Sequence, residues 1–488
     1  MVIAFPLLFV VLPLAGAFLT VLAGRQVKLL GFSLALAVSL LLTLFSLGML
    51  SFIQNTAGHL FVYKIGGWAP PLGITAVFDS LSAIMLVVVN FVSLTAALYS
   101  FRYMDHYTDK WKFYTLFSLM LTGLNGVIIS GDLFNLYIFL EIASISGYSL
   151  VAFGTEAADL EAAFKYAIMG ATASVFILLG IGILYSYTST LNMHDMALVL
   201  INRPQGMLIN FVMVLFLFGF GLKAALVPFH AWLPDAHPSA PAPISAMLSG
   251  VFIKTLGVYA LARVLFNVIG ATPRILFVLL ICGAVSMVAG ACLAIVQRDV
   301  KRLLAYSSIS QVGLIVMALG IGTPLAILGG LFHLVNHAFA KSLLFLNSGS
   351  IDYATGTRDL HKLGGLNLRM PVTAGTNLIG ALSVAGIPPL AGFWSKLLII
   401  IAAVQSGHIM LALVVALVSI VTLAYYLKLQ KDVFAGKLLE ALDNVREVPF
   451  PMRLAVITLS VFCLTGGLLL LPSVLPLLQK AAGVLLGG

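Results

Sequence analysis

The sequence contains 488 residues, of which 61% are hydrophobic and 9% are charged. A soluble globular protein carries roughly 25% charged residues, so this composition excludes a soluble fold and requires lipid around most of the chain. The 26 Lys and Arg residues exceed the 17 Asp and Glu residues, which gives a net charge of +9. In a membrane protein this excess is typical of cytoplasmic loops and does not indicate nucleic-acid binding.

Apolar stretches long enough to cross a bilayer recur along the chain and predict an all-α polytopic membrane protein of about 14 transmembrane helices. An apolar run begins at Met1 without a basic segment, so we interpret it as the first span and not as a cleaved signal. The predicted spans cover 3–23, 29–53, 76–101, 112–130, 132–153, 163–188, 207–232, 240–266, 273–296, 302–321, 325–349, 371–404, 408–430 and 453–478. The polar loops between them are too short to form a soluble domain.

Basic residues between the spans predict the orientation. Seventeen of them, Lys301 included, follow odd-numbered spans, whereas four follow even-numbered spans: Lys64, Arg203, Arg263 and Arg274. The positive-inside rule therefore places the odd loops in the cytoplasm and both termini outside. The expected location is a prokaryotic plasma membrane.

Two predicted spans contain proline breaks in similar surroundings. The seventh reads Ala-Leu-Val-Pro228-Phe-His-Ala-Trp232, and the twelfth reads Ala-Gly-Ile-Pro388-Pro389-Leu-Ala-Gly-Phe-Trp394-Ser-Lys396. Spans four to eight and nine to thirteen are five helices each, and an odd number inverts the second set. We therefore predict a three-helix segment 1–107, two inverted five-helix repeats at 108–268 and 269–432, and a C-terminal helix in 433–488. The alternative is that the prolines merely kink their helices.

Eight of the ionisable side chains within the predicted spans stand out, in a region where one charge costs roughly 3 kcal/mol or more. They are our candidate proton-transfer residues: Glu141, Lys223, His230, Lys254, His333, His337, Lys341 and Lys396. Three cysteines lie in separate apolar segments without a CxxC pair, so we expect no cofactor and no bound metal.

Glu141 and Lys223 form the most informative pair. Asp132 is a helix N-cap, and Glu141 lies about 14 Å further along the axis, near the middle of a ~30 Å hydrocarbon layer. Lys223 precedes Pro228, which must interrupt its helix. We interpret the pair as a carboxylate that keeps a desolvated lysine charged until their contact weakens. The alternative is a static ion pair that fixes helix register.

His333, His337 and Lys341 recur at every fourth residue and therefore line one helix face at about 6 Å spacing. Histidine titrates near neutral pH, so this row predicts a proton wire completed by water. Haem ligation would need histidines from different helices, and unrelated core histidines are the other alternative.

Lys254 lies in mid-span between Gly250 and Gly257, which predict close helix approach. A snorkelling lysine would lie nearer the end of a span. Lys165 and Glu161 are predicted to form a helix-start pair near the surface, either structural or as a modulator of the Glu141 pair.

Lys396 follows the second proline break, where it would release protons to one aqueous face or simply lie near the cytoplasmic end of a half-helix. His230 follows Pro228 and either links Lys223 to Lys254 or caps the broken helix.

Five motifs between about residues 110 and 400 resemble one known family. They are Gly131-Asp-Leu-Phe-Asn-Leu, Lys223 with Pro-Phe-His-Ala-Trp-Leu-Pro-Asp-Ala-His, Lys301-Arg-Leu-Leu-Ala-Tyr-Ser-Ser-Ile-Ser-Gln, His337-Ala-Phe-Ala-Lys-Ser, and Ala385-Gly-Ile-Pro-Pro-Leu-Ala-Gly-Phe-Trp-Ser-Lys. In this order they resemble the antiporter-like subunits of respiratory complex I, Mrp-type Na+/H+ antiporters and membrane-bound hydrogenases. The likeness is greatest to the D-type subunit of the Mrp antiporters and the equivalent hydrogenase subunit.

The resemblance implies fourteen helices, broken helices seven and twelve, and a polar row at the membrane centre. It places the family's functional groups on Glu141, Lys223, Lys254, His333, His337, Lys341 and Lys396. One branch of the family has Glu at the last of these positions.

We therefore expect a proton-translocating subunit of a multisubunit membrane complex, with Na+ as a candidate coupled ion and no redox or hydrolytic site of its own. The expected partners are the lipid bilayer, other antiporter-like and small membrane subunits and, in a redox-driven translocase, Fe–S or NiFe-bearing subunits. The alternatives are an independent secondary transporter of an organic solute and a redox membrane subunit that binds quinone.

Overall fold

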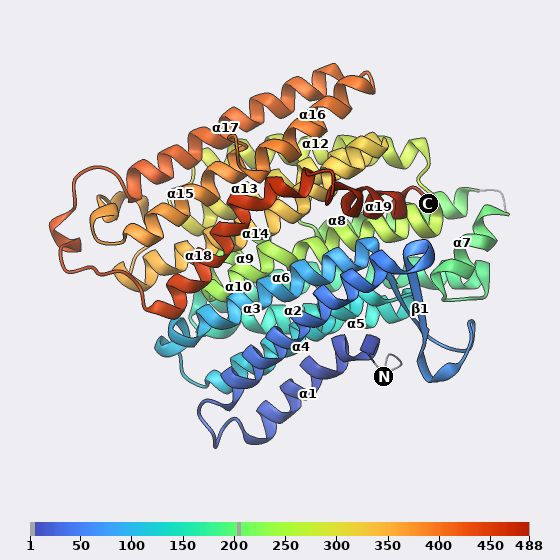
Figure 1. Cartoon of the computed structure of the whole chain (residues 1–488), viewed down its shortest axis with the longest axis horizontal. Coiled ribbons are helices and arrows are strands. Elements are labelled where there is room, and N and C mark those ends of the chain that lie inside the picture. The colour runs from blue at the N-terminus through green and yellow to red at the C-terminus, as the bar shows by residue number, and fades with distance from the viewer. Residues whose placement is uncertain (1–4, 203–205, 488) are drawn as a thin grey trace.

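The computed structural model describes residues 5–202 and 206–487, and these are predominantly helical (Figure 1). The basic residue Arg203 and the start of the first predicted span, 3–23, lie outside the described residues.

The first part of the chain contains most of the helices around the predicted acidic site. Its elements are α1 (Leu8–Ala23), α2 (Leu30–Asn55), β1 (Leu60–Lys64), β2 (Thr75–Asp79), α3 (Ser80–Tyr103), α4 (Lys110–Ile129), α5 (Leu133–Val151), α6 (Ala157–Thr188), α7 (Met193–Ile201), α8 (Met207–Lys223), α9 (Leu233–Ser239), α10 (Ala242–Met247), η6 (Leu248–Tyr259), α11 (Ala260–Ala262) and η7 (Arg263–Ile269). Both η6 and η7 are π-helical.

The second part continues with long helices. Its elements are α12 (Pro273–Ile295), α13 (Val300–Ile321), α14 (Pro324–Thr355), α15 (Pro371–Ala385), α16 (Ala391–Gln405), α17 (Ile409–Val433), α18 (Phe450–Thr465), η11 (Gly466–Leu470) and α19 (Leu475–Leu485). Single 3-10 turns fill several connections, namely η1 (Phe5–Leu7), η2 (Ala57–His59), η3 (Ile65–Gly67), η4 (Met104–His106), η5 (Ala152–Gly154), η8 (Leu360–Lys362), η9 (Leu366–Leu368) and η10 (Glu440–Leu442).

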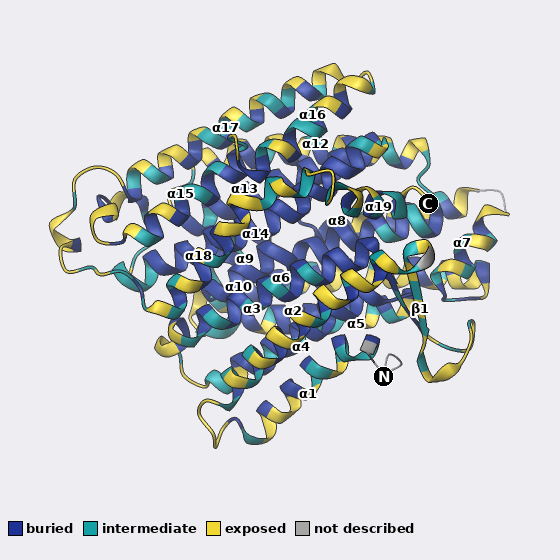
Figure 2. Cartoon of the chain, in the orientation of Figure 1, coloured by how far each residue is buried: buried dark blue, intermediate teal, exposed yellow. Residues whose placement is uncertain are grey.

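Ten helices in the described part of the chain are long and apolar enough to cross a membrane, and shorter apolar helices accompany them. Figure 2 shows the burial: α13 and α14 lie in the buried centre, whereas α1 and α17 have exposed outer faces. These outer faces are apolar, with Leu22 76% and Leu417 61% exposed. Exposed apolar surface of this extent indicates contact with lipid, as the composition predicts.

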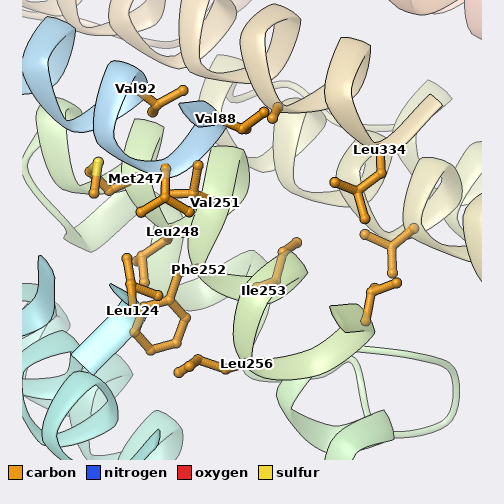
Figure 3. Close-up of a cluster of buried hydrophobic side chains, with 14 of the residues drawn as sticks. Val88, Val92, Leu124, Met247, Leu248, Val251, Phe252, Ile253, Leu256 and Leu334 are labelled. Carbon is orange, nitrogen blue, oxygen red and sulfur yellow. The ribbon is translucent and has the colours of Figure 1, made fainter. Parts of the chain in front are cut away.

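Buried apolar side chains surround η6 at the centre of the bundle. In the close-up of Figure 3, Phe252 and Ile253 of η6 lie near Leu124 of α4, Val88 of α3 and Leu334 of α14. The three flanking helices all pack against η6. The lysine carried by η6 therefore lies in an apolar environment.

Several helix boundaries predicted from the sequence differ from those in the structure. Residues at the start of the predicted span 76–101 form strand β2, which pairs antiparallel with β1 so that Val62 lies opposite Val77. The helix α7 was not predicted, and the predicted span 453–478 is divided into α18, η11 and α19. Figure 1 shows the hairpin, α7 and both ends of the described chain at the same end of the bundle.

A hydrogen-bond pattern at the end of α6 recurs at the end of α14. Thr188 Oγ1 and Thr355 Oγ1 each donate to the carbonyl four residues earlier at 2.8 Å and to the carbonyl two residues later at 3.1 Å. The two threonines are 167 residues apart, 355 minus 188, and α6 and α14 each contain 32 residues.

The N-caps of α5 and α13 share this spacing. Asp132 forms an isolated β-bridge with Asn192, and Asp299 forms one with Asp359. Each member of the second bridge again follows its counterpart by 167 residues, 299 minus 132 and 359 minus 192. The two N-caps, the two bridges and the two threonines therefore recur at the same spacing of 167 residues.

The pair α12 and α13 packs with its backbones in contact. A Cβ at Gly290 would lie 2.5 Å from Ser310 N, and one at Gly313 would lie 2.4 Å from Met287 N. Neither neighbour can move without shifting a helix, since both are main-chain atoms.

We expect Gly290→Val to lower the free energy of unfolding by about 1–3 kcal/mol, because it overpacks this contact. The measurement is the Tm of the purified protein in a mild detergent. Gly182→Val is the matched control, since a Cβ at Gly182 of α6 meets nothing within 4 Å. Equal Tm values for the two variants would contradict the packing argument.

Candidate functional site

The turn at the start of α5 positions Glu141. Asp132 caps α5 as predicted, since its Oδ1 accepts a hydrogen bond from Asn135 N at 2.8 Å. Gly131 N donates to Thr75 O at 2.9 Å, and a Cβ on Gly131 would lie 2.5 Å from Thr75 Oγ1. Glycine is therefore required for the β-hairpin to pack on this turn, and the hairpin holds the beginning of the helix that carries the carboxylate.

Glu141 and Lys223 come together, as the sequence predicts. Lys223 Nζ lies 3.7 Å from Glu141 Oε1, and the side chains are 2% and 23% exposed. Ser174 Oγ donates a hydrogen bond to the same carboxylate oxygen. Lys223 Nζ also donates to Ser144 Oγ at 2.9 Å and to Tyr148 Oη at 3.2 Å. The ammonium group thus has two neutral partners that hold it independently of the carboxylate.

The break in the seventh predicted span follows Lys223 directly. α8 ends at Lys223, and α9 begins at Leu233. Trp232 Nε1 donates to Leu222 O at 3.0 Å, and this bond ties the segment after the break to the last turn of α8. The Trp232 ring stacks on Tyr166 of α6 with centroids 4.2 Å apart. A helix C-terminus carries partial negative charge, so this position also favours the lysine cation.

Lys254 is fully buried in η6, between the two glycines that predicted close approach. A Cβ at Gly257 would lie 2.5 Å from the Cα of Ala224, the residue that follows α8. A Cβ at Gly250 would lie 3.2 Å from Ala338 O of α14. The helix that carries Lys254 therefore touches both the break after α8 and the helix that carries the histidines.

The row on α14 is buried at the centre of the bundle. His333 Nδ1 lies 2.9 Å from Ser395 Oγ of α16, and its Nε2 lies 3.0 Å from Gln311 Oε1 of α13. The rings of His333 and His337 are nearly parallel, with centroids 6.0 Å apart. Within the described residues, neither ring nitrogen of His337 has a hydrogen-bond partner. Lys341 is likewise fully buried.

Four buried lysines donate to main-chain oxygens. The bonds are Lys254 Nζ to Ser249 O, Lys301 Nζ to Ala240 O at 2.7 Å, Lys341 Nζ to Leu304 O at 2.9 Å, and Lys396 Nζ to Ala385 O at 3.1 Å. Ala385 ends α15 and Ala240 follows α9, so two of these oxygens lie at helix ends. Lys396 also neighbours Ser395, which links it to His333.

Two predicted residues lie aside from this row. His230 is half-buried, its Nδ1 has no partner among the residues described, and no hydrogen bond within that part of the chain joins it to Lys223 or Lys254. Lys165 pairs with Glu161 at 2.7 Å as predicted and, in addition, with Asp235 of α9 at 3.2 Å.

The sequence missed three buried polar groups. Lys301 was assigned to a cytoplasmic loop, but it is 1% exposed inside α13; its position shortly after the N-cap Asp299 was the available signal. His237 is fully buried and stacks on Phe345 at 4.3 Å, whereas its proline-rich surroundings indicated a loop. Asn336 gave no signal, because a single amide between two histidines has no distinctive spacing.

Known proteins resemble this chain over most of its length. Residues 130–422 match the family described as NADH:quinone oxidoreductase/Mrp antiporter, TM, and residues 68–114 match the family described as NADH-Ubiquinone oxidoreductase (complex I), chain 5 N-terminus. The N-type subunit of the NADH-quinone oxidoreductase of Desulforudis audaxviator is 37% identical over 440 residues, which are 88% of this chain and 86% of that protein.

Two further proteins also match this chain over most of its length. The D-type subunit of the Na(+)/H(+) antiporter of Alkalihalophilus pseudofirmus is 36% identical over 377 residues, 77% of this chain and 76% of that protein. A chain in the structure of the Mrp complex from Dietzia sp. DQ12-45-1b matches with a TM-score of 0.90 at 27% identity, over 99% of this chain and 96% of that chain. The family resemblance inferred from the five motifs is confirmed.

We expect the Glu141–Lys223 contact to be coupled energetically. Glu141→Gln leaves the buried Lys223 without its carboxylate and should lower the free energy of unfolding by about 3 kcal/mol, the lower end for a buried pair because Glu141 is 23% exposed. Combining it with Lys223→Met should recover at least half of that loss. The measurement is a double-mutant cycle by unfolding in mixed micelles, and strictly additive effects would show that the two side chains do not interact.

Proposed function

We propose that this chain translocates protons as an antiporter-like subunit of a multisubunit membrane complex. The chain belongs to the NADH:quinone oxidoreductase/Mrp antiporter family. The observation that carries the proposal is a set of ionisable groups inside the helical bundle, on α5, α8, η6, α14 and α16: the half-buried Glu141 and the buried Lys223, Lys254, His333, His337, Lys341 and Lys396. Well-packed apolar residues would stabilise a membrane core at lower cost, so the row needs a purpose other than stability.

In the proposed route, Glu141 and Lys223 control proton entry. Lys254 receives the proton across the contact between η6 and the break after α8. The two histidines pass it along α14 beside Lys341, and Lys396 releases it. The contact of Gly257 with Ala224 supports the second step, and the bond from His333 to Ser395 supports the last.

Water is needed to complete this route. A hydrogen bond joins heavy atoms at about 3 Å, whereas Lys223 Nζ lies 3.7 Å from Glu141 Oε1, and neither ring nitrogen of His337 has a hydrogen-bond partner among the described residues. Water molecules that bridge such gaps transmit hydrogen bonds at little energetic cost. His230 takes no step in the proposed route, and we assign it to the broken helix end.

We further propose that the chain crosses the membrane fourteen times as two inverted repeats, α4 to η7 and α12 to α17, with both termini outside. The 167-residue recurrence of caps, bridges and threonine bonds supports the repeat. The breaks after α8 and α15 fall at corresponding places within the two sets.

The proposed partners are other membrane subunits. The relatives are named as subunits of an NADH-quinone oxidoreductase and of a Na(+)/H(+) antiporter, and the matching structure is a complex. We propose that H+ is the ion carried by the row, and that Na+ is the coupled ion where the parent complex is an antiporter.

Glu141→Gln and Lys223→Met should each reduce proton translocation by about 10²-fold, because each removes a positioned proton-transfer group. The measurement is acridine fluorescence quenching in inverted vesicles that contain the assembled complex. Glu440→Gln and Lys437→Met are the matched controls, since both side chains are exposed in the loop after α17. Wild-type flux in an assembled Glu141 or Lys223 variant would refute the proposed route.

A pull-down of the tagged chain from mild detergent, analysed by mass spectrometry, identifies the parent complex. We expect several hydrophobic subunits to co-purify. If they are the sole partners, the complex is a gradient-driven antiporter, whereas Fe–S or NiFe-bearing subunits identify a redox-driven pump. Recovery of the chain alone would contradict the multisubunit proposal.

A further inference from the structure

Helix α17 contributes a buried tyrosine that the proton route proposed above does not use. α17 lies at the edge of the bundle and packs against α15 and α16 (Figure 1). Although its outer face is exposed, Tyr426 of α17 is buried. Lys341 Nζ donates one hydrogen bond to Tyr426 Oη at 3.0 Å and another to Leu304 O of α13 at 2.9 Å. A residue of α17 therefore holds the amino group of a lysine on α14.

The hydroxyl of Tyr426 also has a second partner. Tyr426 Oη lies 3.0 Å from Ser307 Oγ of α13, and either oxygen can donate in this pair. Tyr425 Oη donates to the same Ser307 oxygen at 2.7 Å. Ser307 and both tyrosines are buried. The Tyr426 hydroxyl thus lies between an amino group and a second hydroxyl, and its hydrogen can point toward either one.

The two partners of Lys341 differ in their chemistry. A main-chain carbonyl such as Leu304 O can only accept a hydrogen bond, whereas a phenol can both accept and donate. An ammonium group needs acceptors, and both partners serve it. A neutral amine has a lone pair in addition, and of the two partners only the phenol can donate to it. Lys254 and Lys396 have main-chain acceptors alone among the hydrogen bonds of the described residues.

Lys223 has partners of the same kind as Tyr426. Ser144 Oγ and Tyr148 Oη accept hydrogen bonds from its Nζ, and a hydroxyl that accepts from an ammonium group can turn and donate to an amine. Hydroxyl partners therefore occur at the lysine that is paired with Glu141 and again at the lysine that follows the histidines on α14.

The surroundings of Lys341 contain bases. The titratable groups that interact with it are Lys254 of η6, His237 of α9 and His337 of α14. None of these three groups supplies a negative charge that would hold the ammonium group in place. The position of the amino group therefore depends on its hydrogen bonds to Leu304 and Tyr426.

We propose that Tyr426 is a positioning residue for Lys341, and that its hydroxyl accepts a hydrogen bond from the ammonium group and donates one to the neutral amine. In the charged state Tyr426 donates to Ser307, and in the neutral state Ser307 donates to Tyr426. The change requires rotation about two C–O bonds, and no O–H bond breaks. Lys341 then keeps its place while it releases and regains a proton. The proposal rests on the proposed function and adds α17 to the proton route.

Infrared spectroscopy tests the hydrogen bond independently of transport. The C–O stretching band of tyrosine shifts when the phenol changes from acceptor to donor, and ring-deuterated tyrosine identifies that band. Spectra of the purified complex are compared at neutral and alkaline pH. We expect a pH-dependent tyrosine band that disappears in Tyr426→Phe and also in Lys341→Met. Absence of such a band in the wild type, or its persistence in Lys341→Met, would overturn the proposal.

Tyr99→Phe is the matched control for the loss of a buried phenol. Tyr99 Oη donates to Leu346 O at 2.8 Å and lies 3.1 Å from Ser350 Oγ, and no hydrogen bond among the described residues joins it to a lysine. The pH-dependent band should remain in this variant. Should Tyr426→Phe fail to fold, the comparison of the wild type with Lys341→Met still decides.

Proton translocation in inverted vesicles measures the consequence for transport. Tyr426→Phe should reduce the flux about fivefold, as the loss of one neutral hydrogen bond predicts, whereas Tyr99→Phe should leave it near the wild-type value. Lys341→Met should reduce it about 10²-fold. Equal fluxes in the two phenylalanine variants would overturn the positioning role and leave the proton route standing. Wild-type flux in Lys341→Met would refute the route itself, and the role of Tyr426 with it.

Discussion

The structure depends on supplying polar partners to buried lysine side chains where water is scarce. Lys223 meets this constraint with a carboxylate, a serine and a tyrosine. The lysines further along rely on main-chain carbonyls, and the helix breaks supply some of them: Lys396 uses the last residue of α15, and Lys301 uses the residue after α9. Interrupted helices leave carbonyls unpaired, so the proline breaks provide acceptors as well as bends.

Positions that lie 167 residues apart share caps, bridges and threonine hydrogen bonds but differ in their ionisable side chains. At this spacing Glu141 corresponds to Ser308, and Ser174, which donates to Glu141, corresponds to Lys341. Ser308 bonds to Ser249 of η6 at 2.7 Å instead of meeting a charge. Among these corresponding positions, the first part of the chain therefore carries a carboxylate and the second an amino group. Under the proposed function, this asymmetry gives the route an acidic entrance and a basic continuation.

Hydropathy and caps predicted most of the helical order, and the Asp132 cap gave the start of the helix that carries Glu141 correctly. The errors have local causes. Residues Ala76–Phe78 are apolar and continuous with α3, and a short apolar run does not distinguish strand from helix. Lys301 was misassigned because it adjoins Arg302, and a run of basic residues indicates a loop. The bond to Ala240 depends on a segment 61 residues away, which no local pattern reveals.

Helix α14 carries both the buried histidines and the buried amide of Asn336. Asn336 follows His333 by three positions, so the two side chains lie on one face of α14, where His333 bonds to Gln311 of α13 and Asn336 bonds to Ser383 of α15. Ser383 of α15 bonds to Asn336, while Ser395 of α16 bonds to His333, so both halves of the broken twelfth span are tied to this one helix. A displacement at the break of this span would therefore reach the helix that carries the histidines through these two bonds.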